Sequence, residues 1–192
     1  MTARIREFLK QRQNDGPCLV VDLDVVRDNY SSFAKALPDT KVFYAVKANP
    51  SPWVLDTLWA NGIKNFDVAS ETEAALIATR FPGAQIAFMH PVKSRRAIAR
   101  SFLDFGVKTF ALDSEDELDK ILQETGGAKD LTLMVRFAVS GDGAAYPLTR
   151  KFGVGPEDGP ALLRRARGVS EEMLGVAFHA RTDAAPEAVG RG

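Results

Sequence analysis

The chain has 192 residues, of which 45% are hydrophobic and 26% charged, and this composition excludes disordered and collagen-like classes. Lysine plus arginine equals aspartate plus glutamate at 25 each, so no global charge favours nucleic acid or a membrane surface, and a small-molecule ligand is expected. The single cysteine, Cys18, excludes an intrachain disulfide. Residues Met1–Arg12 lack the apolar core of a signal peptide, and no apolar run approaches the roughly 20 residues of a membrane span. These features predict a cytoplasmic protein.

Short apolar, β-branched and aromatic runs alternate with amphipathic segments along the chain, which is the pattern of βα units and a parallel sheet. An extended segment is expected at Leu19–Asp22, after the Gly16-Pro17 break. The predicted strands follow in chain order: Val42–Val46, Phe66–Ala69, Gln85–Met89, Thr109–Leu112, Leu131–Phe137 and Leu174–Phe178. The first predicted helix has Ile5, Phe8 and Leu9 on one face. The later predicted helices are Val25 to Leu37, Pro52 to Trp59, Glu71 to Thr79, Arg95 to Phe102, Glu115 to Leu122 and Pro160 to Ala166.

The spacing of the strands favours a barrel. Strand ends from Val46 to Phe137 recur roughly every 20–25 residues, near the repeat of an eight-stranded βα barrel. The predicted fold class is therefore α/β, an incomplete (β/α)8 TIM barrel with about six parallel strands. An open, doubly wound sheet is the alternative, although no G-x-G-x-x-G follows the first strand and Gly141-Asp142-Gly143 lies far downstream. Periodicity does not decide between the two.

Two segments lack periodic apolar positions. Ala138–Arg150 contains two glycines and a proline, which predicts a long loop at a strand end. Such a loop is more often a surface connection than a mobile active-site lid. Residues Ala180–Gly192 switch abruptly to small and charged types and are expected to be unfolded or unrelated to the rest.

Lys47 is the first candidate for chemistry, because it directly follows a predicted strand and the carboxyl ends of parallel strands are where sites form. A lysine at a strand end is more often a solvated charge. A desolvated lysine amine, however, loses its proton easily and condenses with an aldehyde to a Schiff base.

Asp67, Arg136 and His179 lie at or just beyond the middle of later strands, so a barrel would bring them to one mouth. Each has a purely structural explanation: a helix cap, an ion pair or a hydrogen-bonded core histidine. Together with Lys47 they could hold an anionic, aromatic cofactor that carries an aldehyde.

Other chemistries lack their motifs: the sequence contains no G-x-S-x-G, C-x-x-C, H-E-x-x-H or G-x-x-x-x-G-K-[ST]. The only histidines, His90 and His179, are far apart and without an obvious carboxylate cluster, so no metal site is predicted.

The run Tyr44-Ala45-Val46-Lys47-Ala48-Asn49-Pro50 resembles the cofactor-lysine motif of the fold-type III pyridoxal-phosphate enzymes, the alanine-racemase-like barrel decarboxylases. Further matches occur in the same order: Pro17–Asp22, Phe66–Ser70, His90–Lys93, Leu112–Glu115, Lys151–Gly153 and Gly175–His179. The resemblance covers nearly everything from Ile5 to His179 and, within the family, is strongest to ornithine decarboxylase.

The resemblance implies pyridoxal 5'-phosphate as cofactor, with Lys47 as the residue that carries it and His179 stacked on its ring. It further implies that Ala45, Asp67, Glu73 and Arg136 belong to the cofactor site. The implied reaction is decarboxylation of a basic amino acid, ornithine to putrescine in polyamine biosynthesis, in a protein that is a homodimer at full length.

The sequence also departs from the family. Ala180-Arg181-Thr182 stands where the family continues with Val-Gly-Ser, and the family's phosphate-binding glycine loop and C-terminal β domain have no counterpart. Residues 1–179 are therefore expected to be the N-terminal portion of the cofactor-binding barrel and 180–192 a divergent tail, and this polypeptide alone is expected to be inactive.

Two alternatives remain open. One is a non-catalytic protein that binds pyridoxal phosphate in cofactor homeostasis. The other is a different family member with the same lysine, such as lysine or diaminopimelate decarboxylase or alanine racemase.

Overall fold

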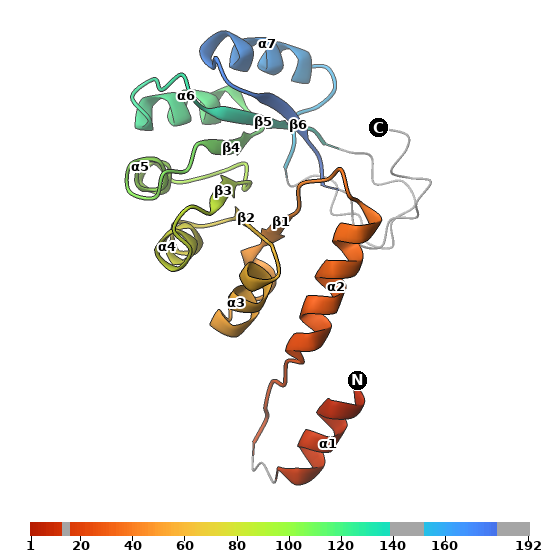
Figure 1. The fold of residues 1–192 in the computed structure, drawn as a ribbon. Helices are drawn as coiled ribbons and strands as arrows, with labels where there is room; N and C mark the ends of the chain where they lie inside the picture. Colours follow the sequence, from red (N-terminus) through yellow and green to blue (C-terminus); the bar gives the residue numbers. More distant parts are fainter. Residues whose placement is uncertain (13–15, 139–151, 180–192) are drawn as a thin grey trace.

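The structure, a computed structural model, describes residues 1–12, 16–138 and 152–179 (Figure 1). Its helices are α1 (Ala3–Gln11), α2 (Leu23–Ala36), α3 (Pro52–Ala60), α4 (Glu71–Arg80), α5 (Arg95–Leu103), α6 (Glu115–Glu124) and α7 (Gly159–Val169). Its strands are β1 (Phe43–Ala45), β2 (Asn65–Val68), β3 (Gln85–Phe88), β4 (Thr109–Leu112), β5 (Thr132–Arg136) and β6 (Leu174–Ala177). Every predicted strand and helix is therefore present, with ends that differ by a few residues.

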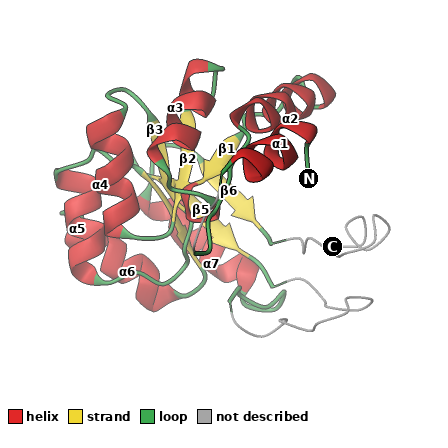
Figure 2. Cartoon of the chain, turned by 90° about the horizontal axis from the view of Figure 1, so that it is seen from below, coloured by secondary structure: helices red, strands yellow, loops and turns green. Residues whose placement is uncertain are grey.

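The strands form one parallel sheet in the order β1-β2-β3-β4-β5-β6, which is also their order in the chain. Figures 1 and 2 show the sheet curving, with α3 to α7 on its outer side. A doubly wound sheet reverses its strand order and carries helices on both faces, so that alternative is wrong. The prediction of part of a (β/α)8 barrel is confirmed.

Alternation along β2 and β5 separates a buried outer face from an inner face. Phe66 and Val68 of β2 are fully buried, whereas Asp67 between them is only partly buried. Leu133 and Val135 of β5 show the same contrast with Arg136. Each large side chain packed under the helices contributes about 1.5–3 kcal/mol, so the outer face fixes the register and leaves the inner face for polar groups.

Serine side chains begin the helices that follow β2, β3 and β4. The hydroxyls of Ser70, Ser94 and Ser114 accept hydrogen bonds from the backbone N–H groups three residues later, at 3.1–3.3 Å. Such an N-cap stabilises a helix by about 1 kcal/mol. The caps also define the short turns between strand and helix, and these turns surround the carboxyl end of the sheet.

The structure differs from the sequence-based expectation at two places. β1 ends at Ala45, and Val46–Ala48 form a 3₁₀ helix, η1, instead of continuing the strand. Leu19–Asp22 has no regular secondary structure before α2 begins. The expectations for the loop after Ala138 and for the tail after His179 concern residues 139–150 and 180–192, which lie outside the described residues.

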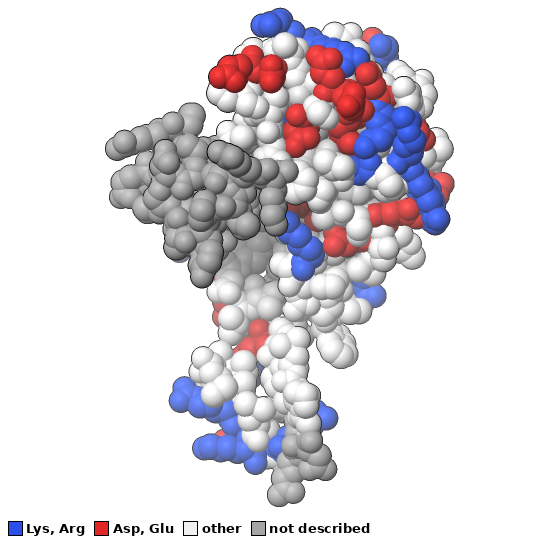
Figure 3. Space-filling model, turned by 180° about the vertical axis from the view of Figure 1, so that it is seen from behind, with Lys and Arg blue, Asp and Glu red and all other residues white. Residues whose placement is uncertain are grey.

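Acidic and basic side chains lie close together on the face seen in Figure 3. Many of them pair between neighbouring helices: Arg100 of α5 contacts Glu71 of α4 at 2.5 Å, and Arg95 of α5 contacts Glu124 of α6 at 2.9 Å. Exposed pairs of this kind contribute little to stability. Among the helices that the structure describes, none has the length and apolar character that would let it cross a membrane.

Candidate active site at the carboxyl end of the sheet

Lys47 lies in η1, directly after β1, and its side chain is exposed while the neighbouring Val46 is fully buried. The chain turns here because the hydroxyl of Tyr44 donates a hydrogen bond to the carbonyl of Asn49 at 3.2 Å. The Asn49 side chain in turn accepts one from the N–H of Ser51 at 3.0 Å, just before α3. The turn anchors the backbone of Lys47 and leaves its amine accessible.

Asp67 lies on the strand next to Lys47: Ala45 of β1 is in register with Asp67 of β2, and Lys47 follows Ala45 by two residues. Burial raises the pKa of Asp67 to about 6; the nearby Lys47 ammonium lowers it, and the Glu73 carboxylate raises it. Glu73 is held in place by its own backbone contacts, since its Oε2 accepts a hydrogen bond from the N–H of Ala69 at 2.7 Å. The structure thus brings Lys47, Asp67 and Glu73 together.

Arg136 ends β5 at the same end of the sheet and is partly buried. Its guanidinium carbon lies 5.6 Å from the centre of the Phe152 ring, a cation–π distance. The backbone of the same segment is bound to β5, since the N–H of Val154 donates to the carbonyl of Arg136 at 2.9 Å. Phe152 also touches the His90 ring edge to face, with the ring centres 5.0 Å apart.

His179 follows β6 and is exposed. Ala177, two residues earlier, is in register with Arg136, and its carbonyl accepts a hydrogen bond from the N–H of Phe137 at 2.8 Å. The sheet therefore places Arg136 and His179 at the carboxyl ends of neighbouring strands, β5 and β6. The Lys47 and Asp67 pair occupies the same end of the sheet on β1 and β2.

The inner face between these groups suits a flat, charged cofactor. Ala45 and Ala87 are in register with Asp67, and Ala177 with Arg136, so small side chains alternate with the polar ones. An alanine methyl group projects little from the sheet. A lysine amine can bond an aldehyde, and a guanidinium and an imidazole can bind an anionic aromatic ring, so the residues present fit pyridoxal phosphate.

Sequence reasoning did not assign Phe152 or His90 to this site. Phe152 belongs to the Lys151–Gly153 motif and His90 to the His90–Lys93 motif, so their places in motifs were the available signal. Within residues 1–12, 16–138 and 152–179, no group of three or more histidine, cysteine, aspartate or glutamate side chains could hold a metal ion.

Comparisons with known proteins agree with this geometry. Residues 23–185 match the family described as pyridoxal-dependent decarboxylase, pyridoxal binding domain. The chain is 36% identical over 164 residues to a lysine/ornithine decarboxylase of Selenomonas ruminantium, covering 85% of this chain and 40% of that protein.

Solved structures of similar proteins share the fold. A mutant of SrLDC in complex with PLP superposes with a TM-score of 0.83 at 32% identity, covering 98% of this chain and 48% of the other. The arginine decarboxylase of Paramecium bursaria Chlorella virus, bound to agmatine, gives a TM-score of 0.84 at 27% identity, over 98% of this chain and 50% of the other.

The chain thus spans about 40% of the length of the curated relative and about half of each solved chain. The match over residues 23–185 includes the strands and turns that carry Lys47, Asp67, Glu73, Arg136 and His179. This chain belongs to the pyridoxal-dependent decarboxylase family and carries its pyridoxal-binding domain.

Proposed function

We propose that this chain is the cofactor-binding part of a pyridoxal-phosphate-dependent decarboxylase whose substrate is ornithine. The observation that carries the proposal is that Lys47, two residues after the Ala45 that is in register with Asp67, lies near this partly buried carboxyl at the carboxyl end of the sheet. A lysine amine placed beside a carboxyl that can hold or release a proton near neutral pH is suited to bonding an aldehyde.

In this proposal Lys47 bonds the cofactor covalently, and Asp67 and Glu73 hold protons and charge around its amine. Arg136 and His179 bind the cofactor from the other side of the site, and Ala45 leaves space for the ring at the end of β1. When bound, pyridoxal phosphate supplies the electron sink that allows carbon dioxide to leave the α-carbon.

The substrate is the finer part of the proposal. The segments Phe66–Ser70, His90–Lys93 and Leu112–Glu115 favour the ornithine decarboxylase branch, with putrescine as product. The relatives act on lysine, ornithine or arginine by their names, so a basic amino acid is the common class. Assays of a longer form of the protein with all three amino acids, each measured as release of carbon dioxide, rank them directly, and a preference for lysine or arginine would contradict the ornithine assignment.

The cofactor link can be tested on the chain itself. The protein is incubated with pyridoxal phosphate and reduced with borohydride, and the labelled peptide is identified by mass spectrometry. Lys47 should carry the label, and Lys47→Ala should lose it. Lys41→Ala is the matched control, because Lys41 is exposed and contacts Gln85 at the amino end of the sheet. Equal labelling of many lysines, or no label at position 47, would contradict the proposal.

Turnover is a separate measurement. The expectation that the 192-residue chain alone is inactive is tested by the release of carbon dioxide from ornithine, and robust turnover would refute it. Labelling at Lys47 without turnover by any longer form of the protein would favour a non-catalytic role in cofactor binding. Sedimentation of a longer form of the protein, with and without cofactor, tests the homodimer expected at full length.

A further inference from the structure

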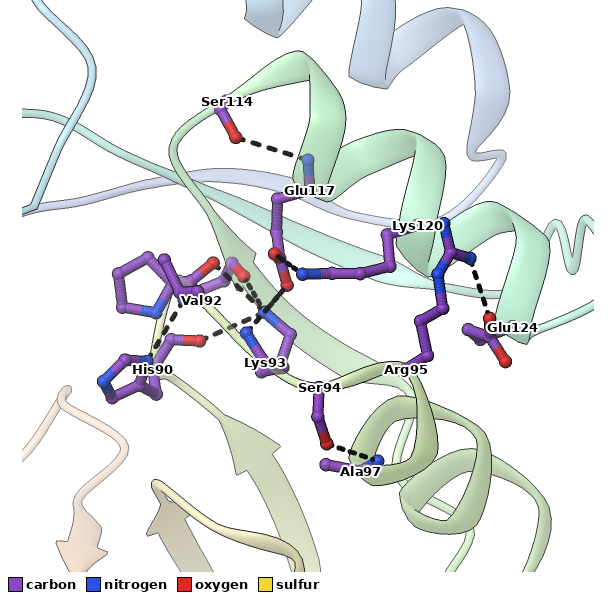
Figure 4. A network of polar contacts seen from close by, with 12 residues as sticks. His90, Val92, Lys93, Ser94, Arg95, Ala97, Ser114, Glu117, Lys120 and Glu124 are labelled. Atoms are coloured by element: carbon purple, nitrogen blue, oxygen red, sulfur yellow. Dashed lines mark hydrogen bonds and ion pairs between the residues drawn. The ribbon is translucent and has the colours of Figure 1, made fainter.

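Lys93 is a buried charge outside the candidate active site. Its side chain is fully buried, at the end of the turn that leads from β3 into α5. Its ammonium donates hydrogen bonds to the carbonyls of Ala111, at 2.6 Å, and His90, at 3.1 Å, and pairs with Glu117 Oε1 at 2.9 Å (Figure 4). These partners come from β4, from the turn itself and from α6, so the ammonium joins three separate elements.

Glu117 completes the connection from α6. Its Oε1 also accepts a hydrogen bond from the backbone N–H of Lys93 at 3.2 Å, and its Oε2 pairs with Lys120 one turn later in the same helix. Desolvation lowers the pKa of Lys93 and the Glu117 carboxylate opposes this. A buried ion pair of this kind is often no better for stability than two apolar side chains of the same size, so stability alone does not account for it.

The turn that Lys93 holds carries His90. The His90 Nδ1 accepts a hydrogen bond from the N–H of Val92 at 3.1 Å, which fixes the ring relative to the turn. In Figure 4 the His90 ring points away from the Lys93 ammonium, while its carbonyl faces that ammonium. The partly buried His90 ring, on the other side of the turn from the ammonium, contacts the Phe152 ring.

Phe152 connects this turn to the candidate active site. Its ring lies between His90, at 5.0 Å, and the Arg136 guanidinium, at 5.6 Å. The next residue is bound to the turn between β4 and α6, since the N–H of Gly153 donates a hydrogen bond to Asp113 Oδ2 at 2.8 Å. Asp113 is also close enough to Lys93 to raise its pKa.

We propose that Lys93 and Glu117 are positioning residues, which hold the turn at His90 so that His90 and Phe152 keep the Arg136 guanidinium in place for the cofactor. The inference deepens the proposed function and rests on it, because Arg136 matters to the site only if the site binds the cofactor. Contacts link Lys93 to Arg136 without a break. Lys93 bonds the His90 carbonyl at 3.1 Å, the His90 and Phe152 ring centres are 5.0 Å apart, and the Arg136 guanidinium carbon lies 5.6 Å from the Phe152 ring centre.

The test uses the histidine ring signals in the nuclear magnetic resonance spectrum of the full chain. The sequence has only two histidines, so His90→Gln assigns the His90 signal. Phe152→Leu removes the aromatic ring beside it and defines the shift of an unstacked His90. In Lys93→Met, the His90 signal should move most of the way toward the Phe152→Leu position. A signal that stays at the wild-type position would overturn the proposal.

Two further variants separate position from stability. Leu118→Ala empties a fully buried site in α6 next to Glu117 and should lower the unfolding temperature without moving the His90 signal. Lys93→Met combined with Glu117→Leu replaces the ion pair by apolar side chains and should recover stability, yet the His90 signal should remain displaced. If both the stability and the wild-type position of the His90 signal are recovered in the double variant, the pair acts through stability alone and the inference is wrong. If Lys93→Met fails to fold, this double variant provides the measurement.

The cofactor provides an independent readout. At limiting pyridoxal phosphate, the double variant should need about tenfold more cofactor than wild type to label Lys47, since about 1.4 kcal/mol of binding corresponds to a factor of ten. Unchanged labelling of Lys47 in the double variant would refute the positioning role. Absence of label in the wild type would remove the proposed function, while the His90 signals would still decide whether Lys93 fixes the His90 and Phe152 pair.

Discussion

The Lys47 ammonium, in the turn directly after β1, lies close enough to the Asp67 carboxyl of the neighbouring strand β2 for the two charges to interact. Burial raises the pKa of Asp67 to about 6, and Lys47 is the strongest influence in the opposite direction. The carboxyl therefore changes its protonation state near neutral pH, at the position where the cofactor would be bonded.

Replacing Lys47 by methionine removes the positive charge and keeps most of the side-chain volume. Because the ammonium lowers the pKa of Asp67, that pKa should rise above about 6 in Lys47→Met. Titration of the Asp67 carboxyl carbon by nuclear magnetic resonance measures the change. Lys41→Met, at the other end of β1, is the control, and an unchanged titration of Asp67 in Lys47→Met would show that the two groups do not interact.

Asp67→Asn should stabilise the fold at neutral pH. Because the folded pKa, about 6, lies above the ordinary value of 3.8, the stability that Asp67 contributes is fully present below about pH 4 and is lost as the pH rises through 6. The variant should be more stable than the wild type at pH 7 by about 1–2 kcal/mol, allowing for screening by solvent, and the difference should vanish toward pH 4. Urea unfolding between pH 4 and 7 measures it.

Asp56→Asn is a control for that experiment, because its effect on stability at neutral pH should have the opposite sign. Arg80 hydrogen-bonds Asp56 at 2.7 Å and lowers its pKa, so this carboxylate contributes stability that is present above pH 3.8 and lost as the pH falls through its folded pKa. Asp56→Asn should therefore be less stable than wild type at pH 7. Identical pH profiles for the two variants would contradict both assignments.

Tyr44→Phe removes the hydroxyl that closes the turn around Lys47. The hydrogen bond to the Asn49 carbonyl is lost, at a cost of about 0.5–1.5 kcal/mol, and the turn should open more often. Hydrogen exchange at the backbone N–H of Ser51 should become faster, because its acceptor is the Asn49 side chain. Tyr30 of α2 lines one pocket together with Tyr44 and Asn49, and Tyr30→Phe should leave that exchange unchanged. Faster exchange in both variants would argue against a local effect.

Gly153→Ala should disturb the segment that carries Phe152. Gly153 has a φ of +111°, and a Cβ atom there would lie 2.4 Å from the backbone nitrogen of Ala138. The strain should exceed about 1 kcal/mol and shift the His90 ring signal. Gly168→Ala is the matched control in α7, where a Cβ atom would meet nothing within 4 Å and should stabilise the helix by about 0.5–1 kcal/mol. Two equally stable variants would contradict this reading of Gly153.

The strands could be predicted because each carries a buried outer face of large apolar residues. Apolar residues at every second position predict a strand, as do β-branched and aromatic side chains; examples are Phe66 and Val68, and Leu133 and Val135. The 3₁₀ turn at Lys47 could not be predicted in this way. It depends on a hydrogen bond between Tyr44 and Asn49, five residues apart, that only the folded chain forms.

Among the site residues, Lys47 and Asp67 were predicted from strand ends and a family motif, and the structure brings them together. The contact of Phe152 with His90 and Arg136 was not predicted, because its three members lie far apart in the sequence and no local pattern links them. The buried pair of Lys93 and Glu117 was missed for the same reason: a lysine in a polar turn looks solvated in sequence.

The sequence by itself determined the α/β class of the fold and singled out Lys47 as the candidate cofactor lysine, since periodicity and a short motif are local properties of the chain. Only the tertiary structure decided between a barrel and a doubly wound sheet, because strand order depends on which side each helix packs. It alone also showed which charges are buried. Desolvation depends on the surrounding packed atoms, and that packing gives Asp67 its raised pKa and Lys93 its fixed partners.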